Sequence, residues 1–351
     1  MKSWDAVILG GGVIGLCCAL ELSKRERKVL VIERGEPGRE ASSAAAGMLA
    51  NCDPHTPELL CSLANASAKL YPEFVHELQD ESGVHIDFRR EGTIAFFAAG
   101  ESSEFGHPLS SEELSKLEPS LEAPGAAHFL PEASVDPRKL MEAIIKCLHR
   151  REIDLSSGAA VVEVEMTGRK VTAVRTEKSR YPTRVAINCA GAWAPRIAPV
   201  PFRTRPVKGQ MLSVIPAPHQ HFSLRHVVRH SSCYLVPRSD GRVVIGSTLE
   251  EAGYDKHVDP ETIQALHQKA ANLLPELGEG RILEAWSGLR PGTPDGLPLL
   301  GETSYGGYLA ATGHYRNGIL LAPITAHIIA KLVCAETPEF DILPFSAERF
   351  L

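Results

Sequence analysis

Features that mark several classes of protein are missing from this sequence of 351 residues. None of its eight cysteines lies in a C-x-x-C pair, which argues against a zinc knuckle and against a thioredoxin-type motif. No uninterrupted apolar run reaches the roughly 20 residues that a membrane-spanning helix needs. Basic residues are the minority, and the net charge of -6 disfavours nucleic acid as a partner. What remains is an ordinary globular composition, 44% hydrophobic and 23% charged.

The cysteines and the first residues bear on the cellular compartment. Cys17 and Cys18 fall in an apolar helical stretch, and Cys189 ends a predicted strand. We expect buried free thiols, which imply a reducing compartment. Glycines at positions 10–12 interrupt the early apolar residues, so no signal peptide is predicted. We therefore expect a cytoplasmic protein without a membrane partner.

The first fifty residues predict a dinucleotide-binding unit. AVILGGGVIG reads as a buried strand followed by a glycine turn, and Gly10, Gly12 and Gly15 have G-x-G-x-x-G spacing. A helix follows, and its N-terminus is where a pyrophosphate binds. Glu33 ends the next strand, KVLVIERG, in the position of an acidic residue that bonds ribose hydroxyls. Its charge would repel a 2′-phosphate, so NADP is disfavoured while NAD and FAD both remain.

The segment EASSAAAGML, residues 40–49, is a run of very small side chains. One interpretation is a flexible loop. The other is a backbone that lies flat along an extended cofactor, and this interpretation favours FAD over NAD.

Further along, the chain predicts an α/β protein, α+β overall, with two kinds of segment. Helices are expected after Asp136-Pro137, after Asp259-Pro260 and from Gly318, and a hairpin is expected to turn at Thr167-Gly168. Two β-rich stretches interrupt the cofactor unit. We expect a discontinuous cofactor domain of residues 1–80, 136–200 and 289–351, and a substrate domain of residues 81–135 and 201–288.

The segment HQHFSLRHVVRH, residues 219–230, raises the question of a metal site. His219 and His221 lie two apart, and His226 and His230 lie four apart. The segment reads as loop and strand, where a spacing of four scarcely converges on one ion, and no cysteine or carboxylate cluster completes a ligand set. We expect solvated histidines and no metal.

Six segments together resemble a known family. They are VILGGGVIGLCCALEL, SSAAAGML, NCAGAWA, CYLVPRSDGRVVIGST, GLRPGTPDGLPLLG and GHYRNGILLAP, and the likeness covers nearly the whole chain. The sequence resembles the D-amino-acid oxidase (DAO) family of FAD-dependent oxidoreductases, and within it the glycine oxidases of the thiamine-biosynthesis type. The resemblance implies a glutathione-reductase-like FAD-binding Rossmann domain joined to a β-rich substrate domain.

The resemblance also implies a reaction and a site. Family members hold FAD non-covalently, oxidise glycine, sarcosine or small D-amino acids by hydride transfer from Cα, and pass electrons to oxygen as hydrogen peroxide. By position, Arg290 matches the carboxylate-binding arginine, Tyr234 the active-site tyrosine, Arg316 a second arginine near the substrate, and Met48 a methionine beside the flavin.

Two positions depart from relatives within this family. Leu249 stands where a glycine oxidase has methionine, at the side-chain end of the substrate pocket, so the preference among small amino acids stays open. Gly288 stands where sarcosine oxidases attach flavin through a cysteine, so no covalent bond is expected. A homo-oligomer is expected by analogy.

The glycine turn, the small-residue segment and the family motifs together assign the cofactor contacts. The expected contacts are Gly10, Gly12, Val13, Ile14, Gly15, Glu33, Arg34, Ser42, Ser43, Ala45, Ala46, Gly47, Met48, Val161, Ala190, Gly191, Trp193, Arg290, His314, Arg316, Asn317, Gly318, Ile319 and Leu320. The helix from Gly318 is expected to aim its N–H groups at the flavin, where negative charge accumulates on reduction.

Three other hypotheses remain at this point. A D-amino-acid dehydrogenase would pass its electrons to a carrier other than oxygen. A non-catalytic dinucleotide-binding protein would have no use for paired arginines near the second glycine-rich region. An NAD-linked dehydrogenase would be colourless.

Overall fold

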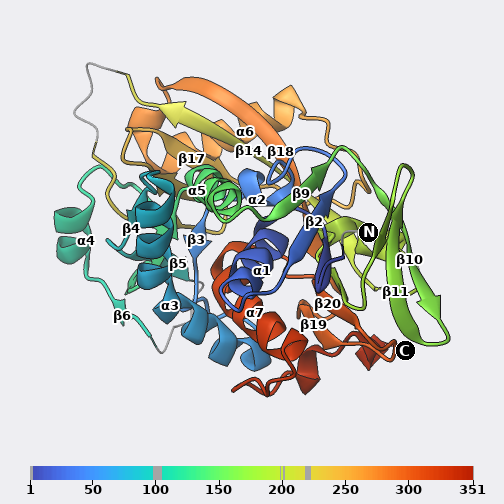
Figure 1. The fold of residues 1–351 in the computed structure, drawn as a ribbon. Helices are drawn as coiled ribbons and strands as arrows, with labels where there is room; N and C mark the ends of the chain where they lie inside the picture. The colour runs from blue at the N-terminus through green and yellow to red at the C-terminus, as the bar shows by residue number, and fades with distance from the viewer. Residues whose placement is uncertain (1–2, 98–104, 198, 201, 218–222, 351) are drawn as a thin grey trace.

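The computed structural model describes residues 3–97, 105–197, 199–200, 202–217 and 223–350. Its central sheet has six strands in the order β19-β20-β13-β1-β2-β9. Figure 1 labels β2, β9, β19 and β20 among them. The strands are β1 (Ala6–Leu9), β2 (Val29–Glu33), β9 (Asp154–Ser157), β13 (Ala186–Asn188), β19 (Leu299–Glu302) and β20 (Tyr308–Thr312). All neighbouring pairs are parallel except β19–β20. Every residue of β1 and β2 is buried, as expected for parallel strands covered on both faces.

Alternate side chains of β1 and β2 enter two different cores. Ile8 and Val31 belong to the core formed with the helices α1 (Val13–Ser23), α3 (Glu58–Ser82), α5 (Pro137–Arg150) and α7 (Gly318–Val333). Leu9 and Ile32 point the other way, into the core formed with the small sheet β10 (Val161–Thr167), β11 (Lys170–Thr176) and β12 (Arg180–Pro182). The unit therefore has three layers, with helices on one face of the parallel sheet and an antiparallel sheet on the other.

The structure confirms several element boundaries that local signals in the sequence predict. The Asp136 carboxylate caps α5 by accepting hydrogen bonds from the N–H groups of Arg138 (2.8 Å) and Lys139 (3.2 Å). Asp259 caps α6 (Pro260–Leu273) in the same way. The predicted hairpin is β10–β11, and Gly168 takes a left-handed φ of 61° in its turn. The cysteines at 17, 18 and 189 are buried and free, as expected.

A second, eight-stranded sheet has the order β18-β14-β17-β16-β15-β5-β7-β6. Its strands are β5 (Thr93–Phe97), β6 (His107–Pro108), β7 (Ala126–Leu130), β14 (Arg205–Ile215), β15 (Val227–Arg229), β16 (Tyr234–Pro237), β17 (Val243–Gly246) and β18 (Arg281–Gly292). It is built from the two stretches for which a β-rich character was expected, and α6 packs on it. β18 continues past residue 288, so the predicted boundary at 288/289 falls inside a strand. The division into two domains stays a prediction.

Smaller elements connect these sheets. The strands β3 (Met48–Leu49), β4 (Phe88–Arg89) and β8 (Ala133–Val135) form a three-stranded sheet in the order β3-β8-β4. The short helices are α2 (Ala41–Ala44), α4 (Ser111–Leu117), and the 3-10 helices η1 (Gly191–Arg196), η2 (Pro275–Leu277), η3 (Leu343–Phe345) and η4 (Ala347–Phe350). Over the described ranges, none of the helices combines the length and apolarity that crossing a bilayer requires.

Candidate cofactor and substrate site

A cavity of about 720 Å³ extends from the end of β2, at Glu33, to the two strands that carry Tyr234 and Arg290. It brings together most of the residues that the sequence assigned to cofactor or substrate. The predicted residues that line it are Gly10, Gly12, Val13, Ile14, Glu33, Arg34, Ser42, Ala45, Ala46, Gly47, Met48, Val161, Ala190, Gly191, Trp193, Tyr234, Arg290, His314, Arg316, Asn317, Gly318 and Ile319. Its elongated lining suits an extended dinucleotide.

Three expected contact residues lie outside the cavity lining. Gly15 packs inside the turn, where an added Cβ would lie 2.1 Å from the carbonyl oxygen of Gly10. The Ser43 hydroxyl donates to the carbonyl of Gly38 at 2.6 Å. Leu320 is buried in the helical core, and its carbonyl accepts a hydrogen bond from Ser67. The structure gives each of the three a role in holding the chain in place.

The glycines of the turn have different surroundings: Gly10 packs against the protein backbone, whereas Gly12 faces the cavity. Gly10 has a φ of 114°, and an added Cβ would lie 2.6 Å from the carbonyl oxygen of Cys189. At Gly12, by contrast, an added Cβ would meet the Ser42 hydroxyl at 3.3 Å and no other described atom beyond its chain neighbours within 4 Å. Gly12 is also the N-cap of α1, so the open side of this glycine lies at a helix N-terminus, where a pyrophosphate fits.

Hydrogen bonds fix the groups around this helix start. The Glu33 carboxylate accepts from the N–H groups of Gly11 (2.7 Å) and Gly35 (2.9 Å). Because a carboxylate has about four acceptor positions, Glu33 keeps capacity for ribose hydroxyls. The Ser42 hydroxyl accepts from the N–H of Val13 at 2.9 Å, which ties the small-residue segment to the turn.

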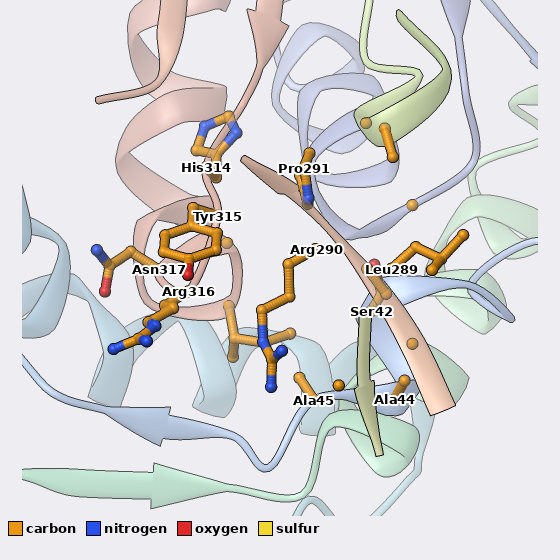
Figure 2. A pocket seen from close by; sticks show the side chains of 18 of the residues that line it. Ser42, Ala44, Ala45, Leu289, Arg290, Pro291, His314, Tyr315, Arg316 and Asn317 are labelled. Atoms are coloured by element: carbon orange, nitrogen blue, oxygen red, sulfur yellow. The ribbon is translucent and has the colours of Figure 1, made fainter. Parts of the chain in front are cut away.

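The small-residue segment is ordered as α2, an extended stretch and β3, so it is not a featureless loop. Figure 2 shows Ser42, Ala44 and Ala45 along one wall of the cavity. A Cβ on Gly288 would lie 2.5 Å from the Cβ of Ala44, so this packing has no room for a cysteine at residue 288. That observation supports the expectation of a non-covalent flavin.

Arg290 reaches from β18 into the cavity, between the wall at Ala45 and the segment that carries Arg316 (Figure 2). Its Nη2 donates to the Ser247 hydroxyl at 2.6 Å, and its Nη1 donates to the carbonyl of Thr248 at 3.3 Å. Within the part of the chain that the structure describes, no carboxylate forms an ion pair with this guanidinium. Neutral acceptors hold Arg290 in position and leave its charge available for an anionic ligand.

Tyr234 and Met48 form an apolar wall of the same cavity. Tyr234 begins β16, and its hydroxyl donates weakly to the sulfur of Met211 at 3.5 Å. The ring lies over Gly246, where an added Cβ would come within 2.3 Å of it. Met48 packs on the same apolar group as Tyr234 and Met211. Leu249, the departure noted above, lines the cavity with 52% of its surface exposed.

The start of α7 and the residues before it line the cavity on the side opposite to Ala44 and Ala45 (Figure 2). Asn317 is the N-cap and supplies no side-chain hydrogen bond, so the first N–H groups of α7 remain for a ligand. Arg316 is exposed, and its guanidinium lies 5.2 Å from the centre of the Tyr315 ring. His314 is buried, is within 3.0 Å of the Thr325 hydroxyl, and burial lowers its pKa to about 3. The imidazole is therefore neutral at physiological pH.

The sequence assigned no role to several site residues, although Gly246 and Ser247 lie in CYLVPRSDGRVVIGST, one of the segments that resemble the family. Ser247 and Gly209 surround Arg290, and Gly246 makes room for Tyr234, through strand pairing rather than local motif. Arg229 also lines the cavity, paired with Asp53 at 2.9 Å. A charged pair this far apart in sequence has no local signature.

The histidine segment does not assemble a ligand set where it is described. The Nδ1 atom of His226 lies 2.7 Å from the carboxylate of Glu118, and that of His230 lies 2.8 Å from the Ser232 hydroxyl. His219 and His221 lie outside the described residues.

Comparisons with known proteins agree with this geometry. The model of the FAD dependent oxidoreductase family, DAO, matches residues 5–332. The glycine oxidase of Geobacillus kaustophilus is 33% identical, over 99% of this chain and 97% of its own length. Its crystal structure superposes with a TM-score of 0.92 at 32% identity, covering 100% of both chains.

Two other relatives show how the match varies in extent. The hydrogen cyanide synthase subunit HcnC of Pseudomonas aeruginosa is 32% identical over 99% of this chain and 97% of its own length. The bifunctional protein ThiO/ThiG of Synechocystis is 36% identical over 99% of this chain, which spans 54% of that relative. This chain thus corresponds to about half of the bifunctional protein.

Proposed function

Because this chain belongs to the DAO family of FAD-dependent oxidoreductases, we propose that it oxidises a small amino acid, glycine or sarcosine first. Small D-amino acids are the remaining candidates. The observation that carries the proposal is the Arg290 guanidinium, which lies in the cavity with a hydroxyl and a carbonyl as its partners. A charge held in this way fits the carboxylate that every amino-acid substrate presents.

The residues present fit the dinucleotide that the family uses. Gly12 and the start of α1 would take the pyrophosphate, Glu33 the ribose hydroxyls, and the small-residue segment the length of the molecule. The first N–H groups of α7 would face the flavin. When bound, FAD supplies the acceptor for the hydride removed from Cα.

The chain's own residues orient the substrate. The planar fork of Arg290 fixes a carboxylate in distance and rotation, which a lysine would not do. The Tyr234 hydroxyl would give a third contact, and Arg316 would add positive charge at the mouth of the cavity. Holding Cα in place for transfer can contribute several powers of ten in rate. No acid or base side chain is needed if the amine binds in its neutral form.

The substrate loses two electrons and two protons to give an imine, which water hydrolyses to a 2-oxo acid and ammonia, or methylamine when sarcosine is the substrate. Molecular oxygen takes up two electrons and two protons and becomes hydrogen peroxide. By analogy with ThiO, we place the activity in thiamine biosynthesis, in the cytoplasm.

The electron acceptor separates this proposal from its nearest rival. Relatives of similar identity include glycine oxidase and a hydrogen cyanide synthase subunit, so oxygen has to be tested directly. The test mixes the purified protein with glycine, sarcosine, D-alanine or D-proline and measures oxygen uptake together with peroxide. Peroxide formed from one of these but not from L-alanine supports the proposal. Substrate oxidation that needs an added quinone or dye supports the dehydrogenase.

A further inference from the structure

Arg238 is a charged residue buried away from the cavity. It follows β16 in the turn to β17, and 5% of its surface is exposed. Burial lowers its pKa, and the nearest carboxylate oxygen, Oδ2 of Asp136, lies 4.0 Å from Nε. Placing a cation in such surroundings is costly unless hydrogen bonds compensate it. The hydrogen bonds of the Arg238 guanidinium therefore indicate the role of this buried side chain.

The guanidinium of Arg238 joins two segments that are remote in sequence. Its Nη2 donates to the carbonyl of Ala46 at 2.6 Å, and its Nη1 donates to the carbonyl of Val135 at 3.4 Å. Ala46 lies in the small-residue segment that lines the cavity, whereas Arg238 itself lines a separate small pocket. The carbonyl of Ala46 therefore points toward Arg238, which is not among the residues that line the cavity.

Gly47, the residue after Ala46, allows the peptide group between them to adopt either of two orientations. A peptide unit is planar and trans, so a carbonyl of Ala46 directed at Arg238 sends the N–H of Gly47 in the opposite direction. Gly47 has a φ of 78°, and glycine tolerates either orientation of the preceding peptide group. The close approach of Val135, whose carbonyl oxygen lies 1.9 Å from where a Cβ on Gly47 would be, also requires glycine here.

We propose that Arg238 is a positioning residue for the cofactor, which holds the Ala46–Gly47 peptide group with its N–H side, and not its carbonyl, toward the cavity. A reversed peptide group would present an acceptor oxygen to a cofactor whose flavin ring and phosphates offer mainly hydrogen-bond acceptors. The two carbonyls need a two-pronged donor, which explains an arginine rather than a lysine. The inference concerns FAD and does not depend on which amine is oxidised.

The test compares Arg238→Met and Arg238→Lys with a control on the same hairpin, Arg242→Met. Arg242 pairs with Asp240 at 2.7 Å, and it shares the carboxylate of Asp136, at 3.6 Å, with Arg238. It is partly exposed and lies outside the cavity lining, so Arg242→Met controls for the loss of a positive charge beside Asp136. The readouts are the dissociation constant for FAD, measured on apoprotein without substrate, the absorption spectrum of the bound flavin, and the unfolding midpoint of the apoprotein. A failure of the substrate proposal would leave all three untouched.

We expect Arg238→Met to weaken FAD binding about tenfold or more and to shift the flavin spectrum, with Arg242→Met within twofold of the parent. The apoprotein of Arg238→Met should also unfold at a lower midpoint, because the buried carbonyls of Ala46 and Val135 lose their donor. The FAD affinity and the flavin spectrum therefore decide the proposal. A lower midpoint with unchanged FAD affinity and spectrum would mean a purely structural role and overturn the proposal. If the methionine variant does not fold, Arg238→Lys decides. It keeps the charge but not the fork, so parental FAD affinity in this variant would also overturn the proposal.

Discussion

A methyl group on Gly209 would lie 2.2 Å from Nη1 of Arg290, so the glycine of β14 makes room for the arginine of β18. The two strands pair along their whole length, and the side chain of Arg290 bends back over Gly209 to reach the cavity. We expect Gly209→Ala to displace the guanidinium and to lower kcat/KM by about 10²-fold, since small misplacements in an active site have effects of this size.

The Gly209→Ala variant should still bind FAD, because Gly209 lies beside Arg290, at the end of the cavity for which we propose substrate binding. Gly306→Ala is its control: this glycine has no left-handed φ, and an added Cβ there would be 3.5 Å from its nearest neighbour. For both variants, kcat/KM is measured by steady-state kinetics, and the flavin content of the purified protein is determined. An alanine variant with parental kcat/KM would mean that the position of Arg290 is not critical.

Replacing Arg290 itself tests the carboxylate site. Arg290→Met removes the two charge-assisted hydrogen bonds that the guanidinium would donate to a substrate carboxylate. Truncating one partner of such a pair typically costs about 2–5 kcal/mol, which corresponds to roughly 30- to 4,000-fold in kcat/KM. Arg290→Lys should recover little of this, because an ammonium lacks the fork. The measurement is kcat/KM with glycine, and flavin content should stay unchanged. Equal losses with an amine that has no carboxylate would contradict the assignment.

Gly12, the N-cap of α1, and Gly15, inside this helix, should respond differently to substitution by alanine. A Cβ on Gly12 projects into ligand space, so Gly12→Ala should weaken FAD binding by about tenfold or more with little change in apoprotein stability. A Cβ on Gly15 meets the carbonyl of Gly10 at 2.1 Å, so Gly15→Ala should destabilise the apoprotein itself by about 1–3 kcal/mol. Chemical unfolding and FAD titration separate the two effects. Loss of stability in both variants would mean that the turn is structural throughout.

The buried imidazole of His314 should make the free energy of unfolding depend on pH below 6.5. Burial lowers its pKa from its usual value of 6.5 to about 3 in the folded state. Between these values the unfolded chain binds a proton that the folded chain does not, so this residue lowers stability as pH falls through 6.5 toward 3. The slope is up to about 1.4 kcal/mol per pH unit. His314→Gln should keep a polar contact with Thr325 and make the unfolding free energy fall less steeply over that range. An unchanged slope would contradict the neutral, buried imidazole.

The parts that could be predicted from the sequence are those with short-range causes. The glycine spacing, the acidic residue at the end of β2 and the aspartates before Pro137 and Pro260 each act within a few residues, and the predicted strand, turn and helices are present. Arg290 was assigned because the motif around it resembles a family, and the structure places it in the cavity with Tyr234 and Arg316.

The parts that could not be predicted depend on pairing between distant strands. Ser247 reaches Arg290 because β14 lies between β17 and β18, and no local pattern encodes that neighbourhood. The burial of Arg238 runs against the usual exposure of arginine and follows from its contact with Ala46, far away in sequence. Ser43 is among the expected cofactor contacts, yet its hydroxyl donates to the carbonyl of Gly38, a contact that the local sequence does not reveal.

The most direct test of the proposed activity is the visible spectrum of the purified protein mixed with excess glycine under strictly anaerobic conditions. We predict a yellow flavin spectrum that bleaches with glycine or sarcosine and returns when air is admitted, together with the formation of peroxide. A flavin that stays oxidised with glycine, sarcosine, D-alanine and D-proline alike would contradict the assignment of this cavity to small amino acids.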